Sequence, residues 1–160
     1  MPTVYMLIGV PGSGKSTWIA NQPFDWARTV IASTDGYIDQ KATELNSTYS
    51  AVFKDHIKDA TASMRESVQH AVNHGLDIVW DQTNTTAKAR RAKLAPFPPT
   101  YKKVAIVFTT PEAKEHAVRL ASRPGKHIPD NVIADMIAGM EMPTAAEGFD
   151  RLLVLLYNTA

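Results

Sequence analysis

A phosphate-binding loop near the amino terminus constrains this chain more than any other feature. Residues 9–17 read Gly-Val-Pro-Gly-Ser-Gly-Lys-Ser-Thr, a complete GxxxxGK[ST] motif, and they follow the apolar run 4–8. A strand before such a loop and a helix after it let backbone N–H groups and the positive end of the helix face phosphate oxygens. Lys15 adds a charge, and the Ser16 hydroxyl suits Mg²⁺. We therefore expect a nucleoside triphosphate to be bound by Gly12, Ser13, Gly14, Lys15, Ser16 and Thr17.

Apolar runs alternate with helix-like segments along the 160 residues, which is typical of a parallel α/β sheet. The expected strands are 4–8, 29–33, 76–80, 104–108 and 152–156. The expected helices are 15–21, 48–74, 86–94, one that Thr110-Pro111-Glu112 begins, and one after Pro129. The sequence therefore predicts a single α/β domain over residues 1–160, with a parallel central sheet of about five strands flanked by helices.

The long helix is expected to bury one face. Its apolar residues recur at spacings of three and four. They are Phe53, Ile57, Ala60, Met64, Val68 and Ala71.

Composition excludes several classes of protein. The chain has no cysteine, so it has neither a disulfide framework nor a thiolate zinc site. No apolar run is long enough for a membrane span, and no targeting segment precedes the first strand, so we expect a cytoplasmic protein with no membrane partner. The net charge of +1 is too small for binding to nucleic acid by bulk charge alone. Ten of the 17 Lys and Arg residues lie between Lys88 and Lys126, which indicates either an anion-facing surface or an ordinary solvated face.

Polar residues follow the second and third expected strands, where parallel sheets carry their functional groups. Asp35 comes one strand away from the phosphate-binding loop, and we expect it to be the general base that accepts a proton from an acceptor hydroxyl. Asp81 ends the third strand and is expected to order the magnesium shell. The alternatives are a turn-forming role for Asp35 and a helix-capping role for Asp81.

A basic segment near the end of the chain is predicted to form a lid over the triphosphate. Residues 119–129 combine cations with turn formers, and we place the lid at about residues 119–140. Arg119 and Arg123 are the expected contacts to the transferred phosphoryl group. A plain connection between two helices is the alternative.

Two adjacent arginines and four histidines lie outside these segments. Arg90 and Arg91 are expected either to contact substrate phosphates or to lie on a solvated helix face. Four histidines are expected on ordinary helix surfaces, because their spacing indicates no metal site. They are His56, His70, His74 and His116.

In order and spacing, these segments resemble the kinase domain of phage polynucleotide 5′-hydroxyl kinase and its P-loop kinase relatives. The segments that carry the resemblance are 9–18, Asp35 with Tyr37, 81–84, Arg90 with Arg91, and 123–129. The resemblance implies an adenylate-kinase-type sheet, ATP and Mg²⁺ as cofactors, and a cytoplasmic location, which is the host cytoplasm if the chain is phage-encoded. It implies that Lys15 and Ser16 hold phosphates and Mg²⁺, that Asp35 is the base and that Arg123 is the lid arginine. The implied substrate contacts are Tyr37, Thr83, Asn84, Arg90 and Arg91.

Two positions depart from the pattern of these kinases. Ile38 stands where they carry an arginine for the acceptor-strand phosphate, and Gln82 stands where they carry an aspartate. Related phage kinases phosphorylate 5-hydroxymethyluracil bases within DNA, and Ile38 is compatible with such an acceptor. The expected acceptor is therefore a nucleic-acid hydroxyl, either a DNA or RNA 5′ end or a hydroxymethyluracil base. A small-molecule kinase for nucleosides, nucleotides or sugars, and a nucleotide-dependent binding module, are the alternatives; oligomeric state and the choice of ATP over GTP stay open.

Overall fold

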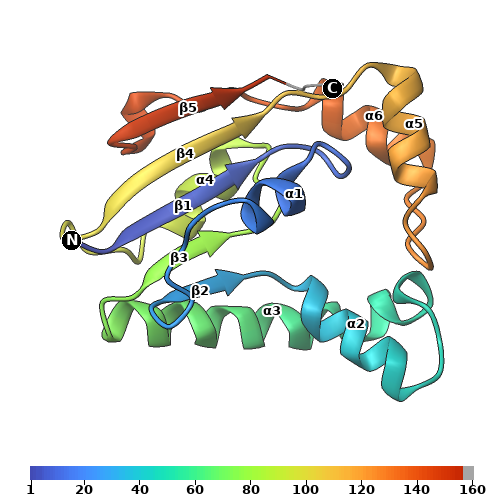
Figure 1. The fold of residues 1–160 in the computed structure, drawn as a ribbon, viewed down its shortest axis with the longest axis horizontal. Coiled ribbons are helices and arrows are strands. Elements are labelled where there is room, and N and C mark those ends of the chain that lie inside the picture. Colours follow the sequence, from blue (N-terminus) through green and yellow to red (C-terminus); the bar gives the residue numbers. More distant parts are fainter. Residues whose placement is uncertain (157–160) are drawn as a thin grey trace.

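Five parallel strands form the central sheet of the computed structural model, which describes residues 1–156 (Figure 1). They are β1 (Thr3–Ile8), β2 (Thr29–Ala32), β3 (Asp77–Trp80), β4 (Lys102–Phe108) and β5 (Arg151–Leu155). Their spatial order is β2-β3-β1-β4-β5, so β1 lies at the centre and pairs with β3 and β4. All four strand pairs are parallel, which confirms the predicted fold class.

Six α-helices and one 3₁₀ helix connect these strands within the described residues. They are α1 (Lys15–Ala20), α2 (Asp35–Glu44), α3 (Tyr49–Asn73), α4 (Ala87–Leu94), α5 (Ala113–Ala121), α6 (Asp130–Ala138) and the 3₁₀ helix η1 (Ala145–Glu147). α2 was not predicted, because only Ile38 and Ala42 are buried along its length and the apolar periodicity is correspondingly weak. α5 begins later than predicted, because Glu112 rather than Thr110 is its cap.

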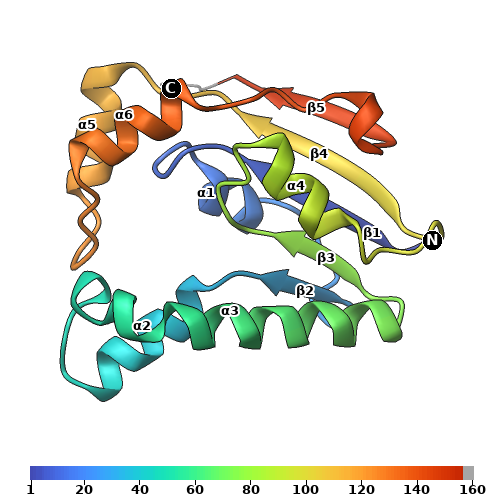
Figure 2. The ribbon, with the colours of Figure 1, turned by 180° about the vertical axis from the view of Figure 1, so that it is seen from behind.

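The inner strands β1, β3 and β4 are largely apolar because both of their faces are covered. Side chains alternate along β1: Val4 and Met6 face the core beneath α3 and α4, whereas Leu7 faces Ile19 of α1. Figure 2 shows α4 over one face with α3 along the β2 side, and Figure 1 shows α1 over the other face. This packing holds the carboxyl ends of β1, β2 and β3 at one edge, where the phosphate-binding loop begins.

α3 buries a slightly different stripe from the one predicted. Val52 is buried near its start, whereas Phe53 is 39% exposed and Ile57 is half-buried. The remainder of the predicted face, at Ala60, Met64, Val68 and Ala71, is buried. Thr48 caps the helix by accepting a hydrogen bond from the Ala51 N–H, and Gly75 follows it with φ 62°.

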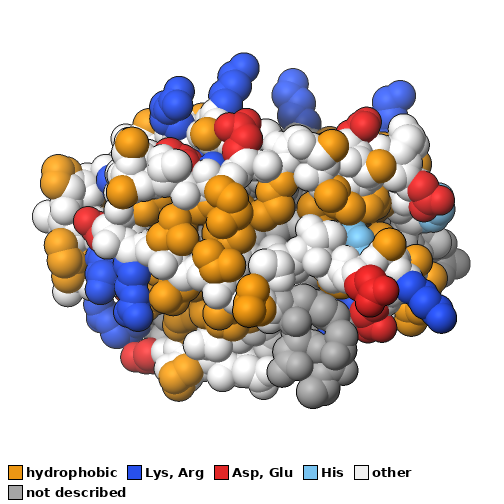
Figure 3. Space-filling model, turned by 90° about the horizontal axis from the view of Figure 1, so that it is seen from above, with side chains coloured by type: hydrophobic (Ala, Val, Ile, Leu, Met, Phe, Trp, Pro, Cys, Tyr) orange, Lys and Arg blue, Asp and Glu red, His pale blue; other side chains and the backbone are white. Residues whose placement is uncertain are grey.

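The surface beside β5 is apolar. Leu152 and Val154 are exposed on this edge strand, and Figure 3 shows hydrophobic side chains across the middle of that side with Lys and Arg along the margins. Among residues 1–156, no helix combines the length and hydropathy needed to cross a bilayer.

Candidate active site

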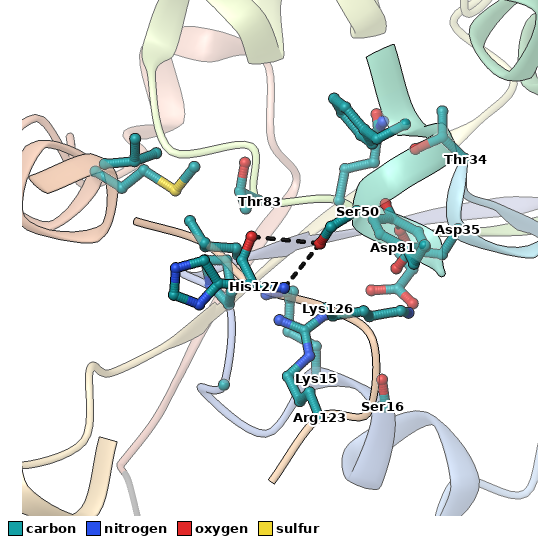
Figure 4. Close-up of a pocket in the computed structure, with 18 of the residues that line it drawn as sticks. Lys15, Ser16, Thr34, Asp35, Ser50, Asp81, Thr83, Arg123, Lys126 and His127 are labelled. Carbon is teal, nitrogen blue, oxygen red and sulfur yellow. Dashed lines mark hydrogen bonds between the residues drawn. The ribbon is translucent and has the colours of Figure 1, made fainter. Parts of the chain in front are cut away.

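A pocket of about 810 Å³ opens at the carboxyl edge of the sheet. Its walls come from the phosphate-binding loop, the residues after β2 and β3, the start of α3, and the segment that joins α5 to α6. Figure 4 shows side chains from these separate segments directed into one space. The pocket thus joins the loop, the two strand-end carboxylates and the basic segment that sequence reasoning had identified separately.

The phosphate-binding loop has the backbone that its glycines permit. Gly12 and Gly14 adopt φ of 77° and 100°, a region that other residues rarely enter. Gly9 has no room for a side chain, because a Cβ there would lie 2.6 Å from the Ser13 Oγ. The tight curve of the loop therefore depends on glycine at three positions, and it leaves backbone N–H groups free to surround phosphate oxygens.

Lys15 is folded against this loop. Its Nζ donates hydrogen bonds to the carbonyl oxygens of Gly9 (2.8 Å) and Val10 (3.0 Å). Burial lowers the pKa of Lys15 to about 8, while the Asp81 carboxylate acts in the opposite direction. A phosphate in the pocket would supply a negative counter-charge for this buried ammonium.

Asp81 and Ser16 are the residues that would hold Mg²⁺. The Asp81 N–H donates to the Ala32 carbonyl, which fixes the residue beside β2, and both Ser16 and Asp81 line the pocket. Burial raises the pKa of Asp81, and the nearby Lys15 acts in the opposite direction. In the described part of the chain, no group of three His, Cys, Asp or Glu residues could hold a metal alone. One carboxylate and one hydroxyl suit Mg²⁺ that also takes oxygens from substrate phosphates and water.

Asp35 is the first residue of α2, and it lies in the same pocket. Its N–H donates to the Ser33 Oγ at 3.1 Å, and its Oδ1 accepts a hydrogen bond from the Tyr49 hydroxyl at 2.6 Å. The negative charge of Asp35 helps to favour the protonated form of Lys15, so the two groups interact across the pocket. The candidate base therefore shares the pocket with the candidate phosphate site, although β3 lies between β2 and β1 and the two strands are not neighbours as expected.

The segment predicted to form the lid contributes two arginines to the pocket lining. A Cβ added at Gly14 would lie 3.8 Å from the Arg119 Nη1, and the Arg119 Nε pairs with Glu115 Oε1 at 3.3 Å. Arg123 lines the pocket after α5 ends, and its charge acts on both Lys15 and Asp81. Both arginines are thus near the site expected for the phosphates.

His116 of α5 contacts the phosphate-binding loop just before the segment predicted to form the lid. It is buried, and its Nε2 lies 2.6 Å from the Pro11 carbonyl oxygen, which requires the proton on Nε2. A side chain at Gly12 would meet the His116 ring at 3.2 Å. The prediction that His116 lies on an ordinary helix surface is wrong, because α5 uses this residue to pack on the loop.

The lid also contacts the far wall of the pocket at the start of α3. The Ser50 N–H donates to the Gly125 carbonyl, and the Ser50 Oγ accepts a hydrogen bond from the His127 N–H at 2.8 Å (Figure 4). Lys126 Nζ lies 4.5 Å from the centre of the Tyr49 ring and 3.5 Å from Asp39 Oδ2. The segment predicted to form the lid thus reaches across the pocket to α3.

Arg90 does not take part in the pocket. It is completely buried, and its Nε and Nη2 donate to the two carboxylate oxygens of Glu147. Its Nη1 donates to the Asn84 carbonyl. Both expectations for Arg90, a substrate contact and a solvated face, are therefore corrected: it is a structural residue. Arg91, its neighbour on α4, is exposed and does not line the pocket.

Thr83 lines the pocket, but Asn84 is turned into the protein. The Asn84 Nδ2 donates to the Leu7 carbonyl at 2.8 Å, and its Oδ1 accepts from Lys93. Asn84 also has φ 48°, so it shapes the turn after β3. Its expected substrate contact is corrected to a structural role.

Tyr37 and Ile38 also lie outside the lining of the pocket. Ile38 is completely buried between α2 and α3, and the Tyr37 ring packs against the same cluster. α2 therefore contributes only Asp35 to the pocket lining.

The basic residues of the second half do not form one surface. Arg90 is buried, and Lys93 donates to Gln82 and Asn84. Lys102 and Lys103 begin β4, at the end of the sheet opposite the pocket. Arg119, Arg123 and Lys126 are the members of this set that line the pocket. Within the pocket lining, the basic residues of this set therefore belong to the segment predicted to form the lid.

Sequence reasoning missed Tyr49 and the apolar side of the pocket. That side is formed by Phe53 and Ile57 of α3 together with Val132 and Met136 of α6. The one signal in the sequence was the position of Tyr49, which directly follows the capping residue Thr48 of α3. Aromatic and apolar residues at helical spacing more often belong to the hydrophobic core. The pattern alone therefore does not distinguish pocket-lining residues from core residues.

Comparison with known proteins supports this assignment of the fold. Residues 4–143 match the profile of a family described as AAA domain. The chain is 22% identical over 165 residues to heterogeneous nuclear ribonucleoprotein U-like protein 2 of Mus musculus, a match that covers 93% of this chain and 21% of that relative. The chain therefore spans about a fifth of that relative's length.

Solved structures with the same fold include proteins that bind or phosphorylate different molecules according to their names. A chain of the Pnkp1/Rnl/Hen1 RNA repair complex superposes with a TM-score of 0.68 at 20% identity, covering 86% of this chain and 43% of that one. A fungal RNA kinase gives 0.56 at 13% identity, covering 99% and 76%. A gluconokinase from Sinorhizobium meliloti gives 0.53 at 14% identity, covering 99% and 85%. At these identities the likeness shows the fold alone.

Proposed function

The chain belongs to the AAA domain family, and we propose that it is an ATP- and Mg²⁺-dependent kinase that transfers the γ-phosphoryl group to a hydroxyl of nucleic acid. The observation that carries the proposal is the position of Asp35. Its carboxylate shares one pocket with Lys15 and Asp81, beside the phosphate-binding loop. Transfer to a hydroxyl uses a positioned base in addition to the residues that bind the nucleotide and the metal, and Asp35 is a second carboxylate available for that role.

Each residue has a defined part in the proposed transfer. The acceptor oxygen attacks the γ-phosphorus while the bond to the β-phosphate oxygen breaks, and ADP leaves. Asp35 accepts the proton that the hydroxyl loses. Lys15, Arg119 and Arg123 stabilise the negative charge that develops on the transferred group. Mg²⁺, when bound by Ser16 and Asp81, would neutralise phosphate charge.

The apolar side of the pocket supports a nucleic-acid acceptor. Phe53, Ile57, Val132 and Met136 lie on the side formed by α3 and α6. A nucleobase can stack on or pack against such a surface, whereas a sugar acid needs many hydrogen-bonding partners. The RNA repair complex and the RNA kinase among the structural neighbours support the same choice.

A small-molecule kinase is the second candidate, because a gluconokinase is also a structural neighbour. The two are separated by incubating the protein with γ-labelled ATP, Mg²⁺ and a panel of acceptors. The panel contains 5′-hydroxyl RNA and DNA, the same DNA carrying 5-hydroxymethyluracil, free nucleosides and gluconate. We expect label on nucleic acid, and blocking the 5′ hydroxyl then separates end from base phosphorylation. Label confined to free nucleosides or gluconate would support the second candidate, and label on no acceptor would overturn both.

A further inference from the structure

We propose that Tyr49 is a positioning residue for phosphoryl transfer: it orients the Asp35 carboxylate and links that orientation to the seating of the lid. The inference rests on the proposed function, because it assigns Tyr49 a role through the general base. Tyr49 touches Asp35 on one side and Lys126 of the lid on the other.

The hydrogen bond from Tyr49 fixes one oxygen of the base. The phenol donates to the Asp35 Oδ1 at 2.6 Å, which is short for a neutral donor and typical of a charged acceptor. Burial and the neighbouring Asp35 carboxylate raise the pKa of Tyr49, so the phenol keeps its proton and stays a donor. The bond occupies Oδ1, and Oδ2 is the oxygen left to accept a proton from an acceptor hydroxyl. A carboxylate held at one oxygen has a single orientation toward the phosphate site.

The Tyr49 side chain is itself held in place by its neighbours. The residue is the first of α3, directly after the capping residue Thr48. Its ring centre lies 5.8 Å from that of Phe53, and Lys126 Nζ lies 4.5 Å above the ring. Cation–π attraction at this distance favours the ring orientation that directs the hydroxyl to Asp35.

The same region of α3 receives the lid. The Ser50 N–H donates to the Gly125 carbonyl, the Ser50 Oγ accepts from the His127 N–H and donates to the His127 carbonyl, and Lys126 pairs with Asp39 of α2. Gly125 lies so close to Thr48 that a Cβ there would approach the Thr48 Cβ to 3.2 Å. Lifting the lid removes the cation from the Tyr49 ring, so the base is aligned best when the lid is seated. Such coupling would favour transfer to an enclosed acceptor over transfer to water.

The test is a kinetic comparison of Tyr49→Phe with the unmodified protein, using γ-labelled ATP and 5′-hydroxyl RNA and DNA oligonucleotides. Phenylalanine keeps the ring and its contacts with Phe53 and Lys126, and removes only the hydroxyl. We expect kcat to fall on the order of tenfold or more, with the KM for ATP and the thermal midpoint little changed. Tyr49→Leu, which also removes the ring from Lys126, should lower kcat further.

A double-mutant cycle separates positioning from a general structural effect. In an Asp35→Asn background, Tyr49→Phe should cause little further loss, because the group it orients can no longer act as a base. Tyr5→Phe is the matched control: its ring packs against Phe24 outside the pocket, and we expect unchanged kinetics.

The possible outcomes keep the two proposals apart. Absence of transfer to either oligonucleotide by the unmodified protein would overturn the proposed function on that acceptor, and the role of Tyr49 with it. Normal transfer with equal kcat in Tyr49→Phe would overturn only the role of Tyr49. An equal fold-loss from Tyr49→Phe with and without Asp35 would show that Tyr49 does not act through the base, which also overturns the inference.

Discussion

Arg90 donates two parallel hydrogen bonds to Glu147, from Nε to Oε1 at 2.7 Å and from Nη2 to Oε2 at 3.2 Å. The arginine side chain has no exposed surface and that of Glu147 is only 8% exposed. Glu147 also accepts a hydrogen bond from the Thr144 N–H, which completes the cap of η1. One carboxylate therefore ties α4 to the segment that leads into β5.

Breaking this pair is expected to destabilise the fold without altering the chemistry of the pocket. Glu147→Gln leaves a buried guanidinium without its counter-charge, and we expect a loss of at least about 2 kcal/mol in the free energy of unfolding. Urea unfolding followed by circular dichroism measures it. Arg91→Met, at the exposed neighbouring position, is the control and should stay within about 0.5 kcal/mol of the parent. Equal stability of Glu147→Gln and the parent would contradict the assigned role.

The pair also predicts a pH dependence of stability. The hydrogen bonds from Arg90 hold the pKa of Glu147 below its ordinary value of 4.5. The stabilisation is therefore complete above pH 4.5 and is lost as the pH falls from there through the lower pKa of the folded state. We expect the difference in unfolding free energy between the parent and Glu147→Gln to shrink between pH 6 and pH 3. A difference that stays constant over this range would exclude the predicted linkage.

Much of the fold follows from local sequence patterns. Apolar runs such as residues 4–8 and 104–108 predict buried parallel strands, and the glycine-rich loop predicts the strand-loop-helix unit around it. α2 was missed because a helix with two buried residues has almost no periodicity to detect. Its first residue, Asp35, was nevertheless identified from its place after β2.

The residues of the candidate site that belong to a local sequence motif could be predicted. The roles that depend on packing between distant segments were missed. Lys15 belongs to a motif, and Asp81 follows an apolar strand, so both positions are visible in the sequence. By contrast, nothing local distinguishes the buried Arg90 from the exposed Arg91. Their difference arises from Glu147, which is 57 residues away along the chain.

The backbone of the phosphate-binding loop predicts a sharp contrast between two glycines. Gly12→Ala places a side chain at φ 77° and 3.2 Å from the His116 ring, so we expect ATP affinity to fall at least tenfold. Gly36→Ala is the control, because a Cβ there meets nothing within 4 Å and α2 would gain helix propensity, of about 0.5–1 kcal/mol. Titration with a fluorescent ATP analogue measures affinity. Unchanged affinity in Gly12→Ala would contradict the assigned loop geometry.

Contact between the lid and α3 predicts a local change in dynamics. Ser50→Ala removes the oxygen that accepts the His127 N–H, so amide hydrogen exchange in residues 122–129 should become faster. Ser67→Ala is the control on the same helix, because the Ser67 Oγ donates only to the Ser63 carbonyl one turn earlier. Hydrogen-exchange mass spectrometry of the nucleotide-free protein measures both. Equal exchange in the two variants would show that Ser50 does not hold the lid.

The most direct test of the central claim is phosphoryl transfer by Asp35→Asn, measured beside its ATP affinity. The substitution keeps the size of the side chain and removes its ability to accept a proton. We expect ATP affinity within about threefold of the parent and transfer to a 5′-hydroxyl oligonucleotide lowered 100-fold or more. Transfer at the parental rate with ATP bound normally would contradict the assignment of Asp35 as the base, and with it the account of this pocket as a kinase site.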